Sequence, residues 1–142
     1  MILYADSSGL AKLYLDEPHS DDVEDWVTAA DAVATSQVTY AEVASALARR
    51  HAAGSLSDLG LRLSLGDLAR SWGDYLVVDV AERPAGDLAV RHVLRGFDAG
   101  HLAAALTPRD AVGADGVALA SFDSALNRAA VHEGLIVLEP RD

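Results

Sequence analysis

The chain begins with Met1-Ile2-Leu3-Tyr4-Ala5-Asp6-Ser7-Ser8, an apolar run that stops at an aspartate and two serines. A short apolar run bounded by polar, turn-forming residues predicts a buried strand. Every residue of the run is apolar, rather than every second one, so we expect both faces of the strand to be covered. Strands of that kind belong to parallel sheets with helices on either side.

The rest of the chain repeats this arrangement. Further strands are predicted at Ala32–Thr35, Tyr75–Val80, Gly116–Ala120 and Leu135–Leu138. Helical spacing of apolar residues predicts helices at Leu10–Tyr14, Pro18–Val27, Thr39–Ala53, Leu56–Trp72, Ala85–Leu94, Asp98–Leu106 and Ser124–His132. One long loop is expected, Thr107–Gly116, because it contains Pro108, Gly113 and Gly116. The alternation predicts an α/β fold of three layers, α/β/α, around a mainly parallel central sheet of four to five strands.

Length and composition set limits on the class of protein. The chain has 142 residues, 51% of them apolar, which fits a single domain over residues 1–142 with a substantial core. The absence of cysteine excludes disulfides, thiolate metal sites and a cysteine nucleophile. The longest apolar runs are five residues, whereas a membrane span needs roughly 20. No basic segment precedes the first apolar run, so we expect no secretion signal, no membrane partner and a cytoplasmic location.

The charge balance initially argues against a nucleic-acid partner. The chain has 22 Asp and Glu against 11 Lys and Arg, a formal net charge of -11. Proteins that bind phosphate backbones normally carry an excess of basic residues. Net charge does not say where the acids lie, however, so the positions of individual acids decide the matter.

Four acids follow the predicted strands. Asp6 comes directly after the first strand, and Asp123 follows the fourth. Glu42 lies on the helix after the second strand, and Asp98 opens a helix after the third strand and its intervening helix. In open parallel sheets the ligand crevice lies outside the carboxyl ends of the strands. All four acids can therefore reach the same edge of one sheet.

Each acid also has a purely structural interpretation. Asp6, Asp98 and Asp123 stand at predicted helix starts, where aspartate is a good N-cap. Glu42 could be an exposed first-turn acid, favoured by the helix dipole. If the four converge, they repel each other unless a hard cation such as Mg²⁺ or Mn²⁺ is bound, because such ions prefer oxygen ligands. A pair of these ions can serve an in-line displacement at phosphorus.

The four acids lie in four motifs whose order and spacing resemble those of the PIN-domain ribonucleases across nearly the whole chain. The motifs are Asp6-Ser7-Ser8-Gly9-Leu10-Ala11-Lys12-Leu13-Tyr14, Thr39-Tyr40-Ala41-Glu42-Val43, Phe97-Asp98-Ala99-Gly100-His101-Leu102-Ala103-Ala104-Ala105 and Ser121-Phe122-Asp123-Ser124-Ala125-Leu126. The length resembles that of the VapC toxins of type II toxin–antitoxin systems. Gly100 departs from the family, which commonly has a larger apolar residue there.

The resemblance implies a Mg²⁺-dependent endoribonuclease that acts on RNA and is held inactive by a VapB-type antitoxin, with Mn²⁺ as a substitute ion. It implies a PIN-like fold and a homodimer. By motif, Asp6 and Asp98 contact the metal directly, and Glu42 and Asp123 complete the acidic pocket. Ser7 and Ser121 would position water at the metal.

Several other residues are candidates for a role in function. His101 lies three residues after Asp98, on the same helix face, and we expect it to be a buried histidine satisfied by a hydrogen bond rather than a ligand. Arginine forks suit phosphate, so four arginines are candidate RNA contacts, with solvated helix faces as the alternative. They are Arg49, Arg50, Arg91 and Arg95. The leucines between Leu56 and Leu68 predict an exposed patch for a partner, or a helix buried on two sides.

Three alternative functions are weighed against the nuclease. A phosphotransfer enzyme of the haloacid-dehalogenase type wants a second aspartate two residues after the strand-end aspartate, where this chain has Ser8. A receiver-like signalling domain needs a late lysine at a strand end, but the only lysine is Lys12. A catalytically silent PIN-like module that only binds a partner is left open, although the four intact acids speak against it.

Overall fold

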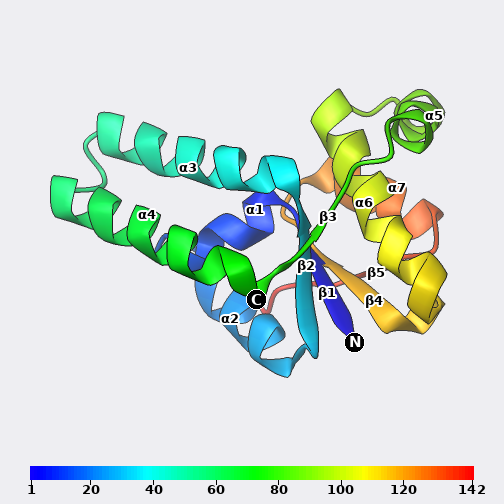
Figure 1. Ribbon diagram of the computed structural model, residues 1–142, viewed down its shortest axis with the longest axis horizontal. Coiled ribbons are helices and arrows are strands. Elements are labelled where there is room, and N and C mark those ends of the chain that lie inside the picture. The colour runs from blue at the N-terminus through cyan, green and yellow to red at the C-terminus, as the bar shows by residue number, and fades with distance from the viewer.

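The computed structural model describes residues 1–142, with one parallel sheet between two layers of helices (Figure 1). The sheet has five strands in the order β3-β2-β1-β4-β5, and every neighbouring pair is parallel. The strands are β1 (Ile2–Ala5), β2 (Ala32–Ser36), β3 (Leu76–Val78), β4 (Val117–Ala120) and β5 (Ile136–Val137). The predicted three-layer parallel fold is confirmed.

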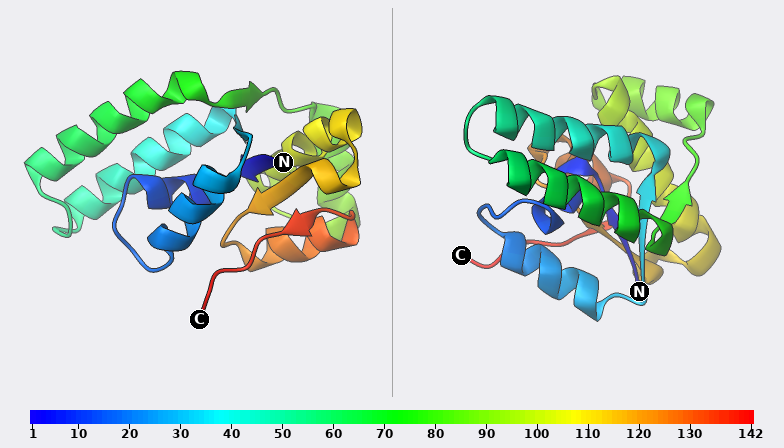
Figure 2. Two further views of the ribbon diagram at one scale, coloured as in Figure 1. Left: turned by 90° about the horizontal axis from the view of Figure 1, so that it is seen from below. Right: turned by 60° about the vertical axis from the view of Figure 1, so that its left-hand side comes forward.

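Helices cover both faces of the sheet (Figure 2). The first group is α1 (Ser7–Leu10), η1 (Ala11–Leu13), α2 (Ser20–Ala29), α3 (Gln37–Ala52) and α4 (Asp58–Ser71). A short 3-10 turn, η2 (Trp72–Asp74), leads into β3. The second group is α5 (Glu82–His92), α6 (Gly96–Val112) and α7 (Ser124–His132), with a 3-10 turn, η3 (Ala114–Gly116), before β4. In Figure 1 the α3–α4 hairpin projects to the left, away from the sheet.

The apolar strand runs supply residues to two separate cores. In β1, Tyr4 packs into the core under α5, α6 and α7, whereas Leu3 and Ala5 pack under the first group of helices. In β4, Leu119 and Ala118 divide between the two cores in the same way. Successive side chains of a strand point to opposite faces, so a strand buried on both sides must be apolar throughout.

The strand order places the functional edge of the sheet. The chain moves from β1 to β2 and β3 on one side and returns to β4 on the other side of β1. The order therefore reverses between β1 and β4, where ligands bind beyond the carboxyl ends of the strands. Asp6 and Asp123 follow these two strands.

Two predicted boundaries are wrong. The expected loop Thr107–Gly116 is helical up to Val112, because α6 continues through Pro108 and ends only at Gly113, where φ is 94°. Pro108 removes only its own N–H bond near the end of the helix, which is less disruptive than a proline at mid-helix. Pro18 lies in the turn before α2, which begins at Ser20 rather than at the proline.

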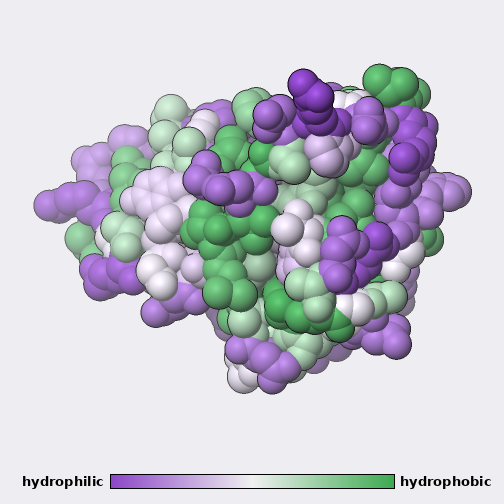
Figure 3. Space-filling model, turned by 45° about the vertical axis from the view of Figure 1, so that its right-hand side comes forward, coloured by the Kyte–Doolittle hydropathy of each residue, from purple (hydrophilic) through white to green (hydrophobic).

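The leucine-rich helix α4 is buried on one side only. Leu68 is fully buried in the core under the first group of helices, whereas Leu59 and Leu63 are each 58% exposed. The edge strand β3 also exposes apolar side chains, at Leu76 and Val77. Figure 3 shows one face of the molecule, on which apolar surface gathers in the middle and hydrophilic surface surrounds much of it. None of the helices is both long enough and apolar enough to cross a membrane.

Candidate active site

Asp6 is the most deeply buried acid in the molecule. It is 3% exposed, and its Oδ1 accepts hydrogen bonds from the Ser8 hydroxyl at 2.7 Å and from the Gly9 backbone N–H at 2.9 Å. Its Oδ2 accepts a third bond from the Ser121 hydroxyl at 2.7 Å. Asp6 is thus the N-cap of α1, and its second oxygen links β1 to the end of β4.

The environment of Asp6 has opposing effects on its ionisation. Burial raises the pKa of the Asp6 carboxyl, and the hydrogen bonds from Gly9, Ser8 and Ser121 oppose that rise. The net direction is upward. A nearby cation would therefore stabilise the ionised form of the Asp6 carboxyl.

Glu42 is attached to the core through a histidine. The Nε2 of His101 is 2.8 Å from Glu42 Oε1, and its Nδ1 is 2.9 Å from the Tyr4 hydroxyl. His101 is 2% exposed, which confirms the buried, hydrogen-bonded histidine predicted from the sequence. Burial raises the pKa of the Tyr4 hydroxyl, so Tyr4 stays protonated and can donate to the imidazole.

The first-turn interpretation of Glu42 is wrong. Helix α3 begins at Gln37, which puts Glu42 in the second turn with its side chain 26% exposed and one oxygen engaged by His101. The hydrogen bond leaves Glu42 Oε2 without a protein partner. The sequence could not show this contact, since it joins residues that are 59 positions apart.

Asp98 and Asp123 share one cation, the guanidinium of Arg95. The Nε of Arg95 donates to Asp98 Oδ2 at 3.0 Å, and its Nη2 donates to Asp123 Oδ2 at 3.1 Å. Asp123 is also the N-cap of α7, because its Oδ1 accepts from the Leu126 N–H at 2.9 Å. The two carboxylates raise the pKa of Arg95, Asp98 through its hydrogen bond more strongly than Asp123.

Two of the three aspartates cap a helix, as their structural interpretation predicted. Capping uses only one carboxylate oxygen, so it leaves the other free for a functional role. Asp6 and Asp123 each use Oδ1 to cap a helix and direct Oδ2 elsewhere, toward Ser121 and Arg95. Asp98 does not cap α6, whose N-cap is Arg95.

All four acids line one open pocket of about 890 Å³ at the carboxyl edge of the sheet. The pocket lies between the start of α1, α3, α5 and the start of α6. No three acidic or histidine side chains are close enough together to enclose a metal ion as they stand. The structure therefore brings the predicted residues into one pocket without drawing them into a closed cluster.

The residues present nevertheless fit a divalent cation. The donors are carboxylate oxygens, which hard cations prefer. Asp98 and Asp123 already lie around one positive group, the guanidinium of Arg95. The Arg95 side chain is 80% exposed to solvent. Because the Arg95 side chain is exposed, water can hydrate its guanidinium when it moves away from the two carboxylates.

One of the two serines that hydrogen-bond Asp6 had no role assigned to it from the sequence. Ser121 donates to Asp6 as described above, but the second donor is Ser8 rather than Ser7. Ser8 also accepts a hydrogen bond from the Phe122 N–H at 2.8 Å, so it joins α1 to the loop after β4. A serine two residues after a capping aspartate is a typical local partner, and that spacing could have indicated Ser8. Ser7 lines the pocket.

Comparisons with known proteins find similar sequences. A family model described as PIN domain matches residues 3–132. Two relatives from Mycobacterium tuberculosis, Ribonuclease VapC45 of strain CDC 1551 / Oshkosh and Ribonuclease VapC49 of strain ATCC 25618 / H37Rv, are each 36% identical over 136 residues. Each of these matches covers 91% of this chain and 89% of the relative.

Two solved structures share the fold. The crystal structure of PAE2754 from Pyrobaculum aerophilum has a TM-score of 0.67 and 17% identity, covering 96% of this chain and 89% of that chain. The crystal structure of FitAcB from Neisseria gonorrhoeae has a TM-score of 0.62 and 18% identity, covering 99% and 98%. At these identities the likeness concerns the fold alone.

Proposed function

Because the chain belongs to the PIN-domain family and is of the VapC type within it, we propose that it is a Mg²⁺-dependent endoribonuclease, the toxin of a toxin–antitoxin pair. One observation carries the proposal: the acids of four separate motifs line a single pocket where the strand order reverses. The names of the two relatives support RNA as the substrate. We expect the reaction to occur in the cytoplasm.

The four acids have different tasks in this proposal. Asp6 and Asp98 bind the ion directly, and Glu42 and Asp123 complete the pocket. When bound, a divalent ion supplies a water of lowered pKa as the nucleophile and stabilises negative charge at phosphorus. Mn²⁺ would substitute, because it takes the same oxygen ligands.

The side chains around the acids keep them in position. The Ser8 and Ser121 hydroxyls hold both oxygens of Asp6, so this carboxylate needs little reorganisation when the ion arrives. His101 fixes Glu42 through Oε1 and leaves Oε2 for the attacking water. Asp98 and Asp123, which Arg95 now contacts, would hold the ion after Arg95 moves away.

The partners follow from the same family membership. A VapB-type antitoxin would inhibit the enzyme, and the net charge of -11 offers a basic segment of that protein a largely acidic surface. We also expect a homodimer. The exposed Leu59 and Leu63, one turn apart on α4, are apolar residues available for a protein interface.

The experiment that tests the proposal is cleavage of single-stranded RNA by the purified protein. We expect cleavage with Mg²⁺ or Mn²⁺ and none in EDTA. Asp6→Asn and Asp98→Asn should each abolish cleavage and growth inhibition. Asp87→Asn is the matched control, because Asp87 is exposed on α5 and makes no ion pair or side-chain hydrogen bond.

Two outcomes would overturn the proposal. Undiminished cleavage in EDTA would exclude the metal mechanism. Full toxicity of both aspartate variants would exclude the site. An intact fold with no cleavage under any metal condition would favour the alternative, a catalytically silent PIN-like module that only binds a partner.

A further inference from the structure

The structure separates the positive side chains into two classes. Of the 11 lysines and arginines, seven form an ion pair with a carboxylate. Four form none: Arg49, Arg62, Arg83 and Arg128. Only Arg49 among these four lines a pocket that adjoins the acids.

Its neighbour on α3, Arg50, already has a carboxylate partner. Arg50 donates to Glu17 Oε2 at 3.0 Å, and Lys12 donates to Glu17 Oε1 at 3.0 Å. Lys12 also lies 4.4 Å above the Phe122 ring. These two cations therefore share one carboxylate and are held in place by it, whereas Arg49 donates only to the Ser45 hydroxyl, at 2.6 Å.

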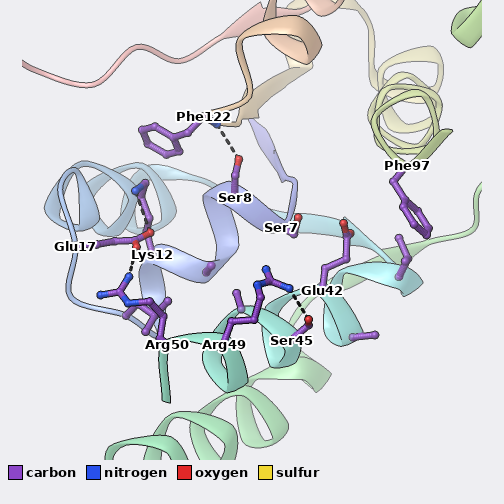
Figure 4. Close-up of a pocket in the computed structure, with 15 residues that line it drawn as sticks. Ser7, Ser8, Lys12, Glu17, Glu42, Ser45, Arg49, Arg50, Phe97 and Phe122 are labelled. Atoms are coloured by element: carbon purple, nitrogen blue, oxygen red, sulfur yellow. Dashed lines mark hydrogen bonds and ion pairs between the residues drawn. The ribbon is translucent and has the colours of Figure 1, made fainter. Parts of the chain in front are cut away.

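Arg49 points into a second pocket that continues from the acidic one. This pocket, of about 630 Å³, lies between α1 and α3, and it shares Glu42 and Phe97 with the pocket that holds the four acids. Figure 4 shows Arg49 reaching from α3 toward Ser7 and Ser8 of α1. Arg49 and Glu42 are seven residues apart, so they lie on the same face of α3, about 10 Å apart along its axis.

An exposed aromatic ring lies where the two pockets meet. Phe97 is 66% exposed although it lines both of them. The other ring in the second pocket, Phe122, is stacked against His19 and Trp26. Phe97 is thus the ring that is available to a ligand.

We propose that the pocket between α1 and α3 binds the nucleotide next to the scissile phosphate, with Arg49 contacting its phosphate and Phe97 stacking on a base. This inference rests on the proposed ribonuclease function. A guanidinium without a carboxylate partner is a strong phosphate contact, because its planar fork matches the phosphate oxygens. An exposed ring stacks on any base, so this pocket adds affinity without strict sequence preference.

The test measures binding of a fluorescein-labelled, mixed-sequence single-stranded RNA by anisotropy, in Mg²⁺. All proteins carry Asp6→Asn, so that the RNA is not cut. Arg49→Gln is compared with Arg62→Gln, which removes the same charge from an exposed arginine on α4 that forms no ion pair and lines neither pocket. Phe97→Ala and Phe97→Tyr form a second pair, in which the tyrosine keeps the aromatic face.

We expect Arg49→Gln to weaken binding about 10-fold, and to lower the slope of log K against log salt by about 0.7, the value for one phosphate on a single strand. Arg62→Gln should leave that slope unchanged, because Arg62 lines neither pocket. Phe97→Ala should weaken binding about 10-fold, within the range measured for stacking, and Phe97→Tyr should restore it. In the cleaving enzyme, Arg49→Gln should raise KM while kcat is kept.

The outcomes also separate this inference from the proposed function. If the unsubstituted enzyme cleaves RNA but Arg49→Gln and Arg62→Gln bind RNA alike and with the same salt slope, Arg49 does not contact a phosphate in this pocket and the inference is wrong. If the Asp6→Asn protein does not bind RNA and the unsubstituted enzyme does not cleave it, the proposed function fails and the inference fails with it.

Discussion

Replacing Gly9 by alanine is expected to damage both the stability of the fold and the geometry of the acidic pocket. Gly9 is buried in α1, where a Cβ atom would lie 2.3 Å from the carbonyl oxygen of Ala120. Real Cβ contacts are essentially never below 3.0 Å. Because the obstacle is backbone rather than a flexible side chain, α1 and β4 must separate by at least about 0.7 Å.

That separation acts on the hydrogen bonds that cross the gap between α1 and β4. The bond from Ser121 to Asp6 is 2.7 Å and the bond from Phe122 N–H to Ser8 is 2.8 Å. An added 0.7 Å brings both to the length at which a hydrogen bond becomes weak. Overpacking costs about 1–3 kcal/mol. Weakening two such bonds adds about 1 kcal/mol or more. A total of about 3 kcal/mol lowers the melting temperature of a chain of this size by roughly 6–12 °C.

The assay is thermal unfolding followed by circular dichroism, with Gly86→Ala as the matched control. Gly86 is in α5, and a Cβ there meets nothing within 4 Å. Alanine is the better helix former by about 0.5–1 kcal/mol, so this variant should melt slightly higher than the parent. A melting temperature for Gly9→Ala within about 2 °C of the parent would refute the reasoning, because it would mean that α1 does not press against the Ala120 carbonyl.

Three further predictions concern single side chains. His101→Ala should lower the free energy of unfolding by about 1–3 kcal/mol, because it leaves the buried Tyr4 hydroxyl without its partner; an unchanged urea midpoint would contradict this. The pKa of Glu133 lies below its usual value, mainly because of the hydrogen bond with His92. Glu133 therefore stabilises the fold at pH values above its unfolded pKa of about 4.3. This stabilisation is lost as the pH falls through the lower pKa of the folded state. Glu133→Gln should therefore lower the melting temperature at pH 7, with the difference shrinking at pH values well below 4.3; a difference that grows in acid would show the opposite sign. Arg95→Gln should tighten Mg²⁺ binding measured by calorimetry, since it removes the cation that two acids now share; weaker binding would exclude competition between Arg95 and the metal.

The sheet and the common location of the acids could be predicted because local pattern determines them. Runs such as Ile2–Ala5 and Val117–Ala120 are apolar at every position, which occurs when both faces of a strand are covered. In a parallel sheet all carboxyl ends lie on one edge, so acids that follow strands share that edge. This reasoning needs no knowledge of side-chain contacts.

The parts that could not be predicted depend on contacts between distant residues. The bond between His101 and Glu42 joins α6 to α3, and no local pattern encodes it. The continuation of α6 past Pro108 shows a related limit, because proline weakens a helix locally while packing along its whole length decides whether it persists. Which arginines form ion pairs also depends on tertiary contacts. Arg49 and Arg50 are adjacent in sequence, but only Arg50 reaches Glu17.

These contacts change the meaning of the net charge of -11. Two bound Mg²⁺ ions would reduce it only to -7, so long-range attraction of RNA stays weak. Most of the positive side chains are engaged by carboxylates, and a single unpaired arginine, Arg49, adjoins the acids. Affinity must then come from short-range contacts: the metal, one guanidinium and the ring of Phe97. Each phosphate contact contributes about 0.7 to the salt slope on a single strand, so an enzyme with one or two such contacts should show a total slope near 1, far below that of a basic nucleic-acid-binding protein. A steep dependence on salt would mean that RNA contacts more positive side chains than Arg49, and would contradict this account.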